Sequence, residues 1–289
     1  MNKKIMHHKR LMYKLLKYKS IIIGGLILLA YIFLVTFGPL IASQGPDEQN
    51  LLATLQPPSR IHPFGTDELG RDMLSRLIHG ARYSFLITLV SVAAAAFIGI
   101  PTGLIAGYKG GVLEAMLVRI VDFILTFPPL VLAILAVTIF GFGLRGLILA
   151  IIVSFFPTIA RLAYIVTRSM RERDFILAAQ ALGAGDLRIL LHHIFPNIAG
   201  PLLVEISLRA GQAVLTTTAL GFLGLGVAPP TPEWGVIMAR GKDFLFIAPH
   251  IVMTTGIVIS LSVLGFNLFA DGLRDMLDPK MRRIGWRLG

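Results

Sequence analysis

Long apolar runs constrain this chain more than any other feature of its sequence. Residues 21–42 form a run of 22 positions without a charge, and about 20 apolar residues suffice for a helix to cross the hydrocarbon core of a bilayer. Only 15% of all residues are charged, against about 25% in a soluble domain. The sequence therefore predicts an all-α membrane protein with six transmembrane helices. The expected spans are residues 21–42, 84–108, 120–140, 144–166, 202–227 and 246–270.

The N-terminal segment, residues 1–20, carries seven lysines and arginines and no acidic residue. Apolar side chains are interspersed with these charges, as in an amphipathic helix that lies on the anionic cytoplasmic surface of a membrane. A cleaved signal peptide is the alternative interpretation. The apolar run that follows is longer than the core of a signal peptide, and no Ala-x-Ala cleavage site comes after it. We therefore expect residues 21–42 to be retained as the first span.

The distribution of lysine and arginine predicts the orientation of the chain. Arg145 and Arg161 lie inside the expected span 144–166 and are counted with the segments next to it. With the N-terminus inside, 19 of the 27 basic residues then belong to the cytoplasmic side, seven belong to the external side and Arg209 is left in a span. Cytoplasmic segments of membrane proteins are enriched in lysine and arginine, so both termini are expected in the cytoplasm. The expected organisation is an external loop at 43–83, a five-helix core at 84–270 that includes a cytoplasmic central loop at 167–200, and a cytoplasmic tail at 271–289.

Composition and motifs argue against several functions. The net charge of +11 is explained by basic cytoplasmic segments, and no basic run interleaved with aromatic residues indicates nucleic-acid binding. The absence of cysteine excludes disulfides and thiolate metal sites, and no two histidines have the i, i+4 spacing of a helical metal site. No G-x-x-x-x-G-K-[ST] string occurs. The chain is therefore not expected to bind ATP, a metal or another cofactor itself.

Small and charged residues inside the spans have structural explanations. Asp122 lies three residues from Arg119, and we expect either a local ion pair between the two or a role of Asp122 at the helix end. Glu205 and Arg209 have the i, i+4 spacing of a helical ion pair, and contact of either residue with the substrate is the alternative. An intramembrane enzyme would need a nucleophile or metal ligands beside these acids, and the spans offer none. Four glycines at every fourth position favour close packing of the second span within this subunit. They are Gly99, Gly103, Gly107 and Gly111.

The central loop is a long polar interruption in an otherwise apolar chain. Residues 176–182 favour a helix because most of them are good helix formers. Gly183 is expected to end this helix, since glycine adopts the left-handed conformation that helix ends need. Asp186 is expected to cap a second short helix at 187–194. Two short helices joined by glycine form an elbow suited to docking another protein.

Three features of this loop carry a family resemblance. They are the Ala178-Ala179 pair, Gly183 four residues later, and the Ile-Phe-Pro string at 194–196. They resemble the "EAA" cytoplasmic loop of bacterial ABC-importer permeases, which in that family fits a cleft on the ATPase subunit. Leu177 stands where the motif has its glutamate, and we expect it to pack there in place of the acid. The expected ATPase-coupling surface consists of Leu177, Ala178, Ala179, Gly183 and Asp186.

Three further strings resemble the permeases of dipeptide, oligopeptide and nickel importers. They are Phe-Gly-Thr-Asp-x-x-Gly-Arg-Asp at 64–72, the glycine- and proline-rich segment at 221–235, and the polar C-terminal string at 266–280. With the central loop, these strings cover about residues 60–280 in the family's order. The resemblance implies the fold of a type I ABC-importer permease.

The same strings carry local expectations. Asp67 or Asp72 is expected to cap a short interfacial helix at 72–77. Arg71 and other basic residues nearby offer ion-pair partners to these acids, so we do not expect paired-carboxylate catalysis there. Trp234 suits the membrane–water interface.

The resemblance also implies a function and partners. The expected assembly contains a second homologous permease, two cytoplasmic ATPase subunits that bind ATP, and an external substrate-binding protein. The chain is then a permease subunit of the bacterial cell membrane rather than an enzyme, and it works by alternating access. Short peptides are the first choice of cargo, and nickel or a metal chelate is the alternative. A secondary transporter is the remote alternative, because the spans show neither coupling-ion acids at mid-span nor an inverted repeat.

Overall fold

The computed structural model describes residues 19–42 and 44–277, and all regular elements in this part of the chain are helical. The expected N-terminal amphipathic helix and most of the cytoplasmic tail lie outside the described residues. The elements are α2 (Lys19–Ile41), η1 (Leu51–Ala53), α3 (Met73–Lys109), α4 (Gly111–Leu125), α5 (Pro129–Phe140), α6 (Leu144–Arg171), α7 (Asp174–Ala181), α8 (Asp186–Arg188), η2 (Ile189–Ile194), α9 (Phe195–Phe222), α10 (Trp234–Gly241), η3 (Lys242–Phe244) and α11 (Pro249–Leu277).

Five long helices are apolar enough to cross a membrane: α2, α3, α6, the continuous stretch Asp186–Phe222 that includes α9, and α11. The remaining expected span, the third in chain order at 120–140, is not one straight helix. It is broken into α4 and α5, which meet at 96°. Pro128 and Pro129 explain the break, because proline lacks the N–H of a helical bond and disfavours helical backbone in the residue before it.

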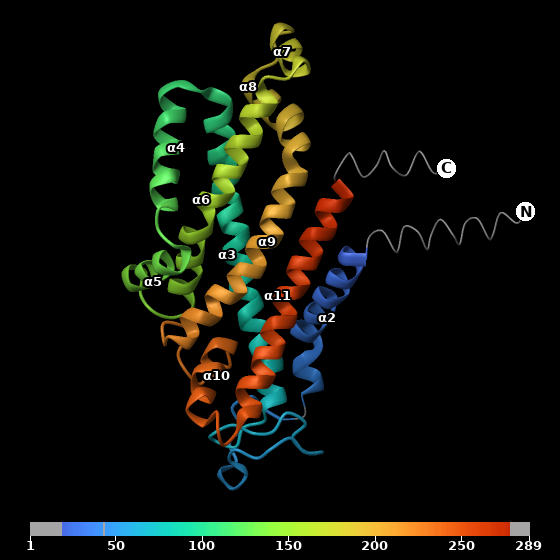
Figure 1. Cartoon of the computed structure of the whole chain (residues 1–289), viewed down its shortest axis with the longest axis vertical. Helices are drawn as coiled ribbons and strands as arrows, with labels where there is room; N and C mark the ends of the chain where they lie inside the picture. The colour runs from blue at the N-terminus through green and yellow to red at the C-terminus, as the bar shows by residue number, and fades with distance from the viewer. Residues whose placement is uncertain (1–18, 43, 278–289) are drawn as a thin grey trace, which may run out of the picture.

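The long helices lie side by side, and their ends group in a defined way (Figure 1). The helices α7 and α8 lie at one end of the molecule, and α2 begins and α11 ends on the side that faces this end. The loop of residues 44–72 and helix α10 lie at the other. The described start of α2, the described end of α11 and the central loop are therefore all on the side of the bundle away from α10.

Close packing of α3 against α6 builds the centre of the molecule. A Cβ atom on Gly99, Gly103 or Gly107 would overlap backbone or side-chain atoms of α6, so glycine lets the two helices approach. The expectation of packing within the subunit is confirmed for these three glycines. It is wrong for Gly111, which lies in α4, has a positive φ and faces no neighbouring atom.

Trp234 lies in the core rather than at the membrane surface, so the expected interfacial role is wrong. Its side chain is fully buried, and its indole Nε1 donates a hydrogen bond to the Leu77 carbonyl at 3.1 Å. The ring packs edge-on against Tyr31 of α2 and Phe85 of α3. Burial among aromatic rings together with a backbone acceptor satisfies both the apolar ring and its N–H group.

Asp72 caps a helix, as expected, but that helix is not a separate short one. The carboxylate accepts a hydrogen bond from the Ser75 N–H at 2.8 Å, and the helix then continues as α3 to Lys109. Residues 73–83, expected in the loop, are therefore the first turns of a span. No glycine or proline occurs between Met73 and His79 to end the helix.

Candidate functional site

The central loop forms the tip of the molecule between α6 and α9. Helix α7 extends beyond the ends of the long helices (Figure 1). Four isoleucine side chains hold this tip to the bundle, because all of them are buried in one apolar cluster with the ends of α3 and α6. They are Ile176, Ile189, Ile194 and Ile198.

Gly183 shapes the elbow between α7 and α8. Its φ is +80°, and it follows the last residue of the α7 turn. The Ala184 N–H bonds to the Ala179 carbonyl at 3.0 Å, and the Gly183 N–H bonds to the Gln180 carbonyl at 2.9 Å. This pair of bonds is the Schellman arrangement, which satisfies the last carbonyls of a helix and favours glycine at the left-handed position.

The elbow presents apolar side chains to its surroundings. Leu182 is 89% exposed and Leu187 is 69% exposed, and Leu177 and Ala178 also face outward. Ala179 is partly buried. Exposed leucines at one protruding tip indicate a surface that another protein covers. We call this surface the tip patch; it consists of Phe175, Leu177, Leu182, Leu187 and Leu191.

Asp186 belongs to the elbow but has another role than the one expected. Gly185 precedes the first residue of α8 and no side chain caps that helix, so the expected capping role is wrong. The Asp186 carboxylate instead accepts hydrogen bonds from the Tyr108 hydroxyl, at 3.0 Å, and from the Lys109 ammonium. The Lys109 ammonium at the end of α3 is a charged donor, and the Asp186 carboxylate bonds to it rather than to the backbone N–H groups of α8, which are neutral donors. The central loop is thereby tied to α3 as well as to α6 and α9.

Sequence reasoning missed part of this site. The tip patch includes Leu182 and Leu187, which flank the glycines in an otherwise polar segment, and that contrast was a usable signal. The bonds from Tyr108 and Lys109 to Asp186 had no such signal, because 77 residues separate Lys109 from its partner.

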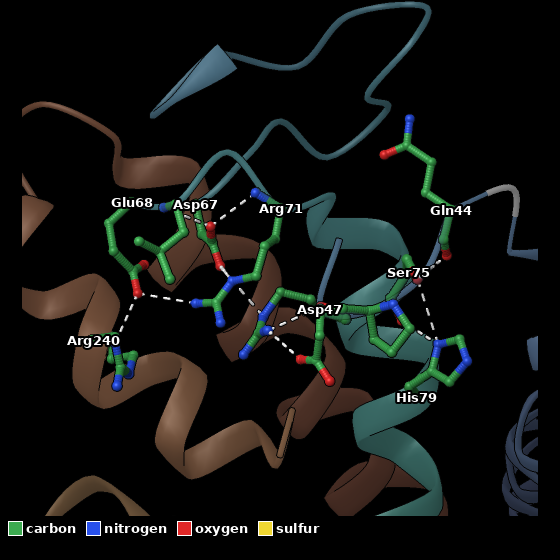
Figure 2. Close-up of polar contacts among 11 residues, drawn as sticks. Gln44, Asp47, Asp67, Glu68, Arg71, Ser75, His79 and Arg240 are labelled. Atoms are coloured by element: carbon green, nitrogen blue, oxygen red, sulfur yellow. Dashed lines mark hydrogen bonds and ion pairs between the residues drawn. The ribbon is translucent and has the colours of Figure 1, made fainter. Parts of the chain in front are cut away.

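A second polar site fastens the loop before α3 at the opposite end of the molecule. Asp67 is its hub: one oxygen accepts bonds from the Leu69 and Arg71 N–H groups at 2.9 and 3.0 Å, and the other accepts from Arg71 Nε at 2.6 Å. Arg71 also donates a hydrogen bond to the Glu68 carboxylate at 3.0 Å. Glu68 accepts a second bond, at 3.1 Å, from Arg240 in helix α10 (Figure 2). Opposite charges so paired offset the cost of burying them.

Further bonds tie the same loop to α3 and α11. The guanidinium of Arg76, in the first turns of α3, lies 3.4 Å from Asp67 and donates to the Pro46 carbonyl at 3.0 Å. His62 lies 3.0 Å from the Asp72 carboxylate, and His250 at the start of α11 lies 3.0 Å from the Thr66 carbonyl. The acids here are engaged in structural ion pairs, as expected.

Two ion pairs lie within the expected spans. Arg209 Nε donates to Glu205 at 2.6 Å, as the spacing predicted. Asp122 does not pair with Arg119, so that expectation is wrong. Its carboxylate lies 3.3 Å from Arg161 of α6, because packing of α4 against α6 offers a partner that sequence spacing could not show.

Glu233 is a buried acid in the segment between α9 and α10. It caps α10 by accepting bonds from the Gly235 and Val236 N–H groups at 2.9 and 3.1 Å, and the Ser84 hydroxyl lies 3.5 Å away. All three partners are uncharged. Burial removes the Glu233 carboxylate from water, which disfavours its charged form and raises its pKa to about 7. The three hydrogen bonds favour the charged form, but their effect on the pKa is smaller. Within residues 19–42 and 44–277, no three potential ligands gather closely enough to hold a metal ion.

The comparisons with known proteins agree with this arrangement. Residues 99–283 match the family described as "Binding-protein-dependent transport system inner membrane component". The chain belongs to this family. Residues 9–58 match a second family, the "N-terminal TM domain of oligopeptide transport permease C". The protein is therefore a multi-pass permease subunit of a bacterial inner-membrane ABC importer and not an enzyme, and its family implies an ATPase and a substrate-binding protein as partners.

Several curated members of this permease family are similar over most of their length. The dipeptide transport system permease protein DppC of Alkalihalophilus pseudofirmus is 43% identical over 93% of this chain and 88% of its own. The di/tripeptide transport system permease protein DppC of Pseudomonas aeruginosa is also 43% identical, over 90% and 88%. The glutathione transport system permease protein GsiD of Pectobacterium atrosepticum is 40% identical over 78% and 75%.

A solved structure supports the predicted permease fold. The MetNI methionine ABC transporter, in an inward-facing conformation, aligns with a TM-score of 0.58 over 71% of this chain and 98% of that chain. Sequence identity is 20%, so the likeness concerns the fold alone. The expected all-α fold of an ABC-importer permease is confirmed, with five helices able to cross a membrane, or six if the bent pair of α4 and α5 is one span.

Proposed function

We propose that this permease carries short peptides across the membrane, and that its central loop is the surface on which the ATPase docks. The observation that carries the choice of cargo is the similarity to dipeptide and di/tripeptide permeases at 43% identity over nearly the whole chain. Import of nickel or a metal chelate is the second candidate, and no curated relative named above is described by such a cargo.

The tip patch supports ATPase docking. It consists of exposed leucines and one phenylalanine on a protruding elbow, at the end of the molecule opposite α10. The expected coupling residues Leu177, Ala178 and Gly183 lie on or beside it. An apolar anchor set in a polar rim is the usual composition of an energetically important interface.

The connections of the elbow suggest how ATPase motion reaches the membrane. The elbow joins α6 directly to α9, and Asp186 ties it to Tyr108 and Lys109 at the end of α3. A displacement of the tip would therefore act on three spans at once. We propose that this lever drives alternating access, with the ATPases binding ATP and this chain binding no cofactor.

The proposed assembly pairs this chain with a second, homologous permease and two ATPase subunits. The substrate-binding protein would dock at the opposite end, on the loop of residues 44–72 and on α10. The ion pairs of Asp67, Glu68 and Arg240 support this assignment, because they hold both elements in one fixed surface.

Replacement of Leu182 by aspartate tests the docking site. The side chain is 89% exposed, so we expect the variant to fold, while a buried charge in the interface lowers the yield of co-purified ATPase by about tenfold, equivalent to about 1.4 kcal/mol. Phe246→Asp, at the other end and 99% exposed, is the matched control and should retain the ATPase. Equal recovery from both variants would contradict docking at the tip patch.

Uptake by the purified complex tests the cargo. We expect proteoliposomes containing all subunits to accumulate a radiolabelled dipeptide in an ATP-dependent manner, and excess nickel not to compete. Accumulation of nickel without dipeptide uptake would replace the first candidate by the second.

A further inference from the structure

A row of polar side chains runs along one face of α9 inside the membrane-spanning region. Glu205, Arg209, Gln212 and Thr216 are separated by four, three and four residues, which places them one above another on a helix. Ala210, Ala213 and Val214 on the other side of α9 are buried in the core. The row therefore lies on a side of the helix that this chain does not fully cover.

Arg209 lies well inside the membrane-spanning stretch that ends at Phe222. Arg209 precedes Phe222, the last residue of α9, by thirteen positions, or about 20 Å along the helix axis. The hydrocarbon core is about 30 Å thick. A charge that faces lipid at this depth costs roughly 2.5–3.5 kcal/mol even on the lowest scales, so an uncovered row of this kind needs water or protein beside it.

The row satisfies its hydrogen bonds within α9. Arg209 donates to Glu205 at 2.6 Å and to Gln212 at 2.5 Å, and the Thr216 hydroxyl donates to the Gln212 carbonyl at 3.0 Å. In the part of the chain that the structure describes, no other element supplies a hydrogen bond or an ion pair to Glu205 or Arg209. Their side chains are 16% and 19% exposed, and Gln212 is more open still. The pair is thus neutralised but remains accessible from outside the chain.

We propose that this row lines the aqueous path of the cargo, and that Arg209 and Glu205 receive the carboxylate and the ammonium of a zwitterionic short peptide. Four residues of helix separate the backbone positions of Glu205 and Arg209 by about 6 Å along the axis, and two extended residues of a peptide span about 7 Å at most. When the peptide binds, the ion pair between Arg209 and Glu205 is replaced by two ion pairs, one at each end of the peptide, so the site stays neutral. This inference rests on the proposed peptide function, since it assigns a binding site for that cargo.

The chain contains no cysteine, which allows a direct test of aqueous access. Gln212→Cys is compared with Leu215→Cys, an exposed apolar position on another face of α9. Both variants are placed in the complete transporter in proteoliposomes and treated with a charged, membrane-impermeant thiol reagent. We expect rapid modification of Gln212→Cys only. During turnover, a zwitterionic dipeptide should slow this modification, whereas the same dipeptide capped at both ends should not.

The contrary outcomes are specific. An unreactive Gln212→Cys that cross-links to the second permease would place the row at the subunit interface and overturn the proposal. An unreactive residue that does not cross-link would also overturn it. If Gln212→Cys is modified but the wild type takes up no dipeptide, the peptide function fails while the water-lined row stands. If dipeptide uptake occurs without modification, the row alone is refuted.

An exchange of charges separates cargo binding from a structural role. The double variant Glu205→Arg with Arg209→Glu keeps an i, i+4 ion pair but reverses the positions of its charges. Assembly is checked by co-purification of the ATPase. We expect assembled transporter with dipeptide uptake reduced by about tenfold or more, which corresponds to about 1.4 kcal/mol. Uptake at the wild-type rate would show that only mutual neutralisation matters and would overturn the proposal.

Discussion

Gly183 is the residue on which the shape of the coupling elbow depends. Its φ of +80° disfavours any other residue, at a cost of roughly 1–2 kcal/mol, and no neighbouring atom would offset that cost with new contacts. We expect Gly183→Ala to lower ATPase activity stimulated by the binding protein several-fold, by shifting the tip patch. Gly185→Ala is the matched control, since Gly185 has a φ of −67° and equally free space. Equal losses in both variants would refute the role of the left-handed turn.

Titration of the single residue Glu233 is expected to make the folding stability of the permease depend on pH. Burial raises its pKa from 4.5 to about 7, so between these values the folded state keeps a proton that the unfolded state releases. Stability contributed by this proton falls as pH rises toward and through about 7. We expect the melting temperature of the complex to fall between about pH 5 and about pH 8, and Glu233→Gln to reduce that fall. Glu48→Gln, at an exposed carboxylate, should leave the slope unchanged; an identical slope in Glu233→Gln would contradict the assignment.

At the scale of elements, close backbone contact holds α2 to α11. A Cβ on Gly24 would overlap the backbone of α11 at Gly265, Leu268 and Phe269, whereas one on the adjacent Gly25 would meet nothing within 4 Å. We therefore expect Gly24→Val to destabilise the permease by about 1–3 kcal/mol through overpacking. Gly25→Val should have little effect. Thermal unfolding of both variants in the same detergent measures the difference, and equal melting temperatures would contradict this contact.

At the scale of the whole molecule, the central loop with the tip patch lies at one end, while α10 and the residues that follow it lie at the other. This arrangement predicts that they lie on opposite sides of the membrane. A reagent that cannot cross membranes should label Phe246→Cys in intact cells and label Leu182→Cys only after permeabilisation. The opposite pattern would reverse the orientation that the basic residues predict.

Hydropathy and local chemistry were sufficient for much of the molecule. Runs of about 20 apolar residues specify membrane helices because lipid offers no hydrogen bonds to the backbone, so the five long spanning helices and their order followed from the chain alone. The cap at Asp72, the pair of Glu205 with Arg209 and the turn at Gly183 also followed, since each depends on residues close in sequence. The family resemblance rested on short strings of the same kind.

Contacts between distant segments were decided only by the tertiary structure. Asp122 pairs with Arg161 rather than with Arg119, because α4 packs against α6. Asp186 pairs with Lys109 rather than capping α8, because α3 ends beside it. Trp234 is apolar enough for either a membrane surface or a core, and the aromatic cluster around it made the choice. In each case the side chain had a local option within its own segment, and the free energy of a partner far along the chain outweighed it.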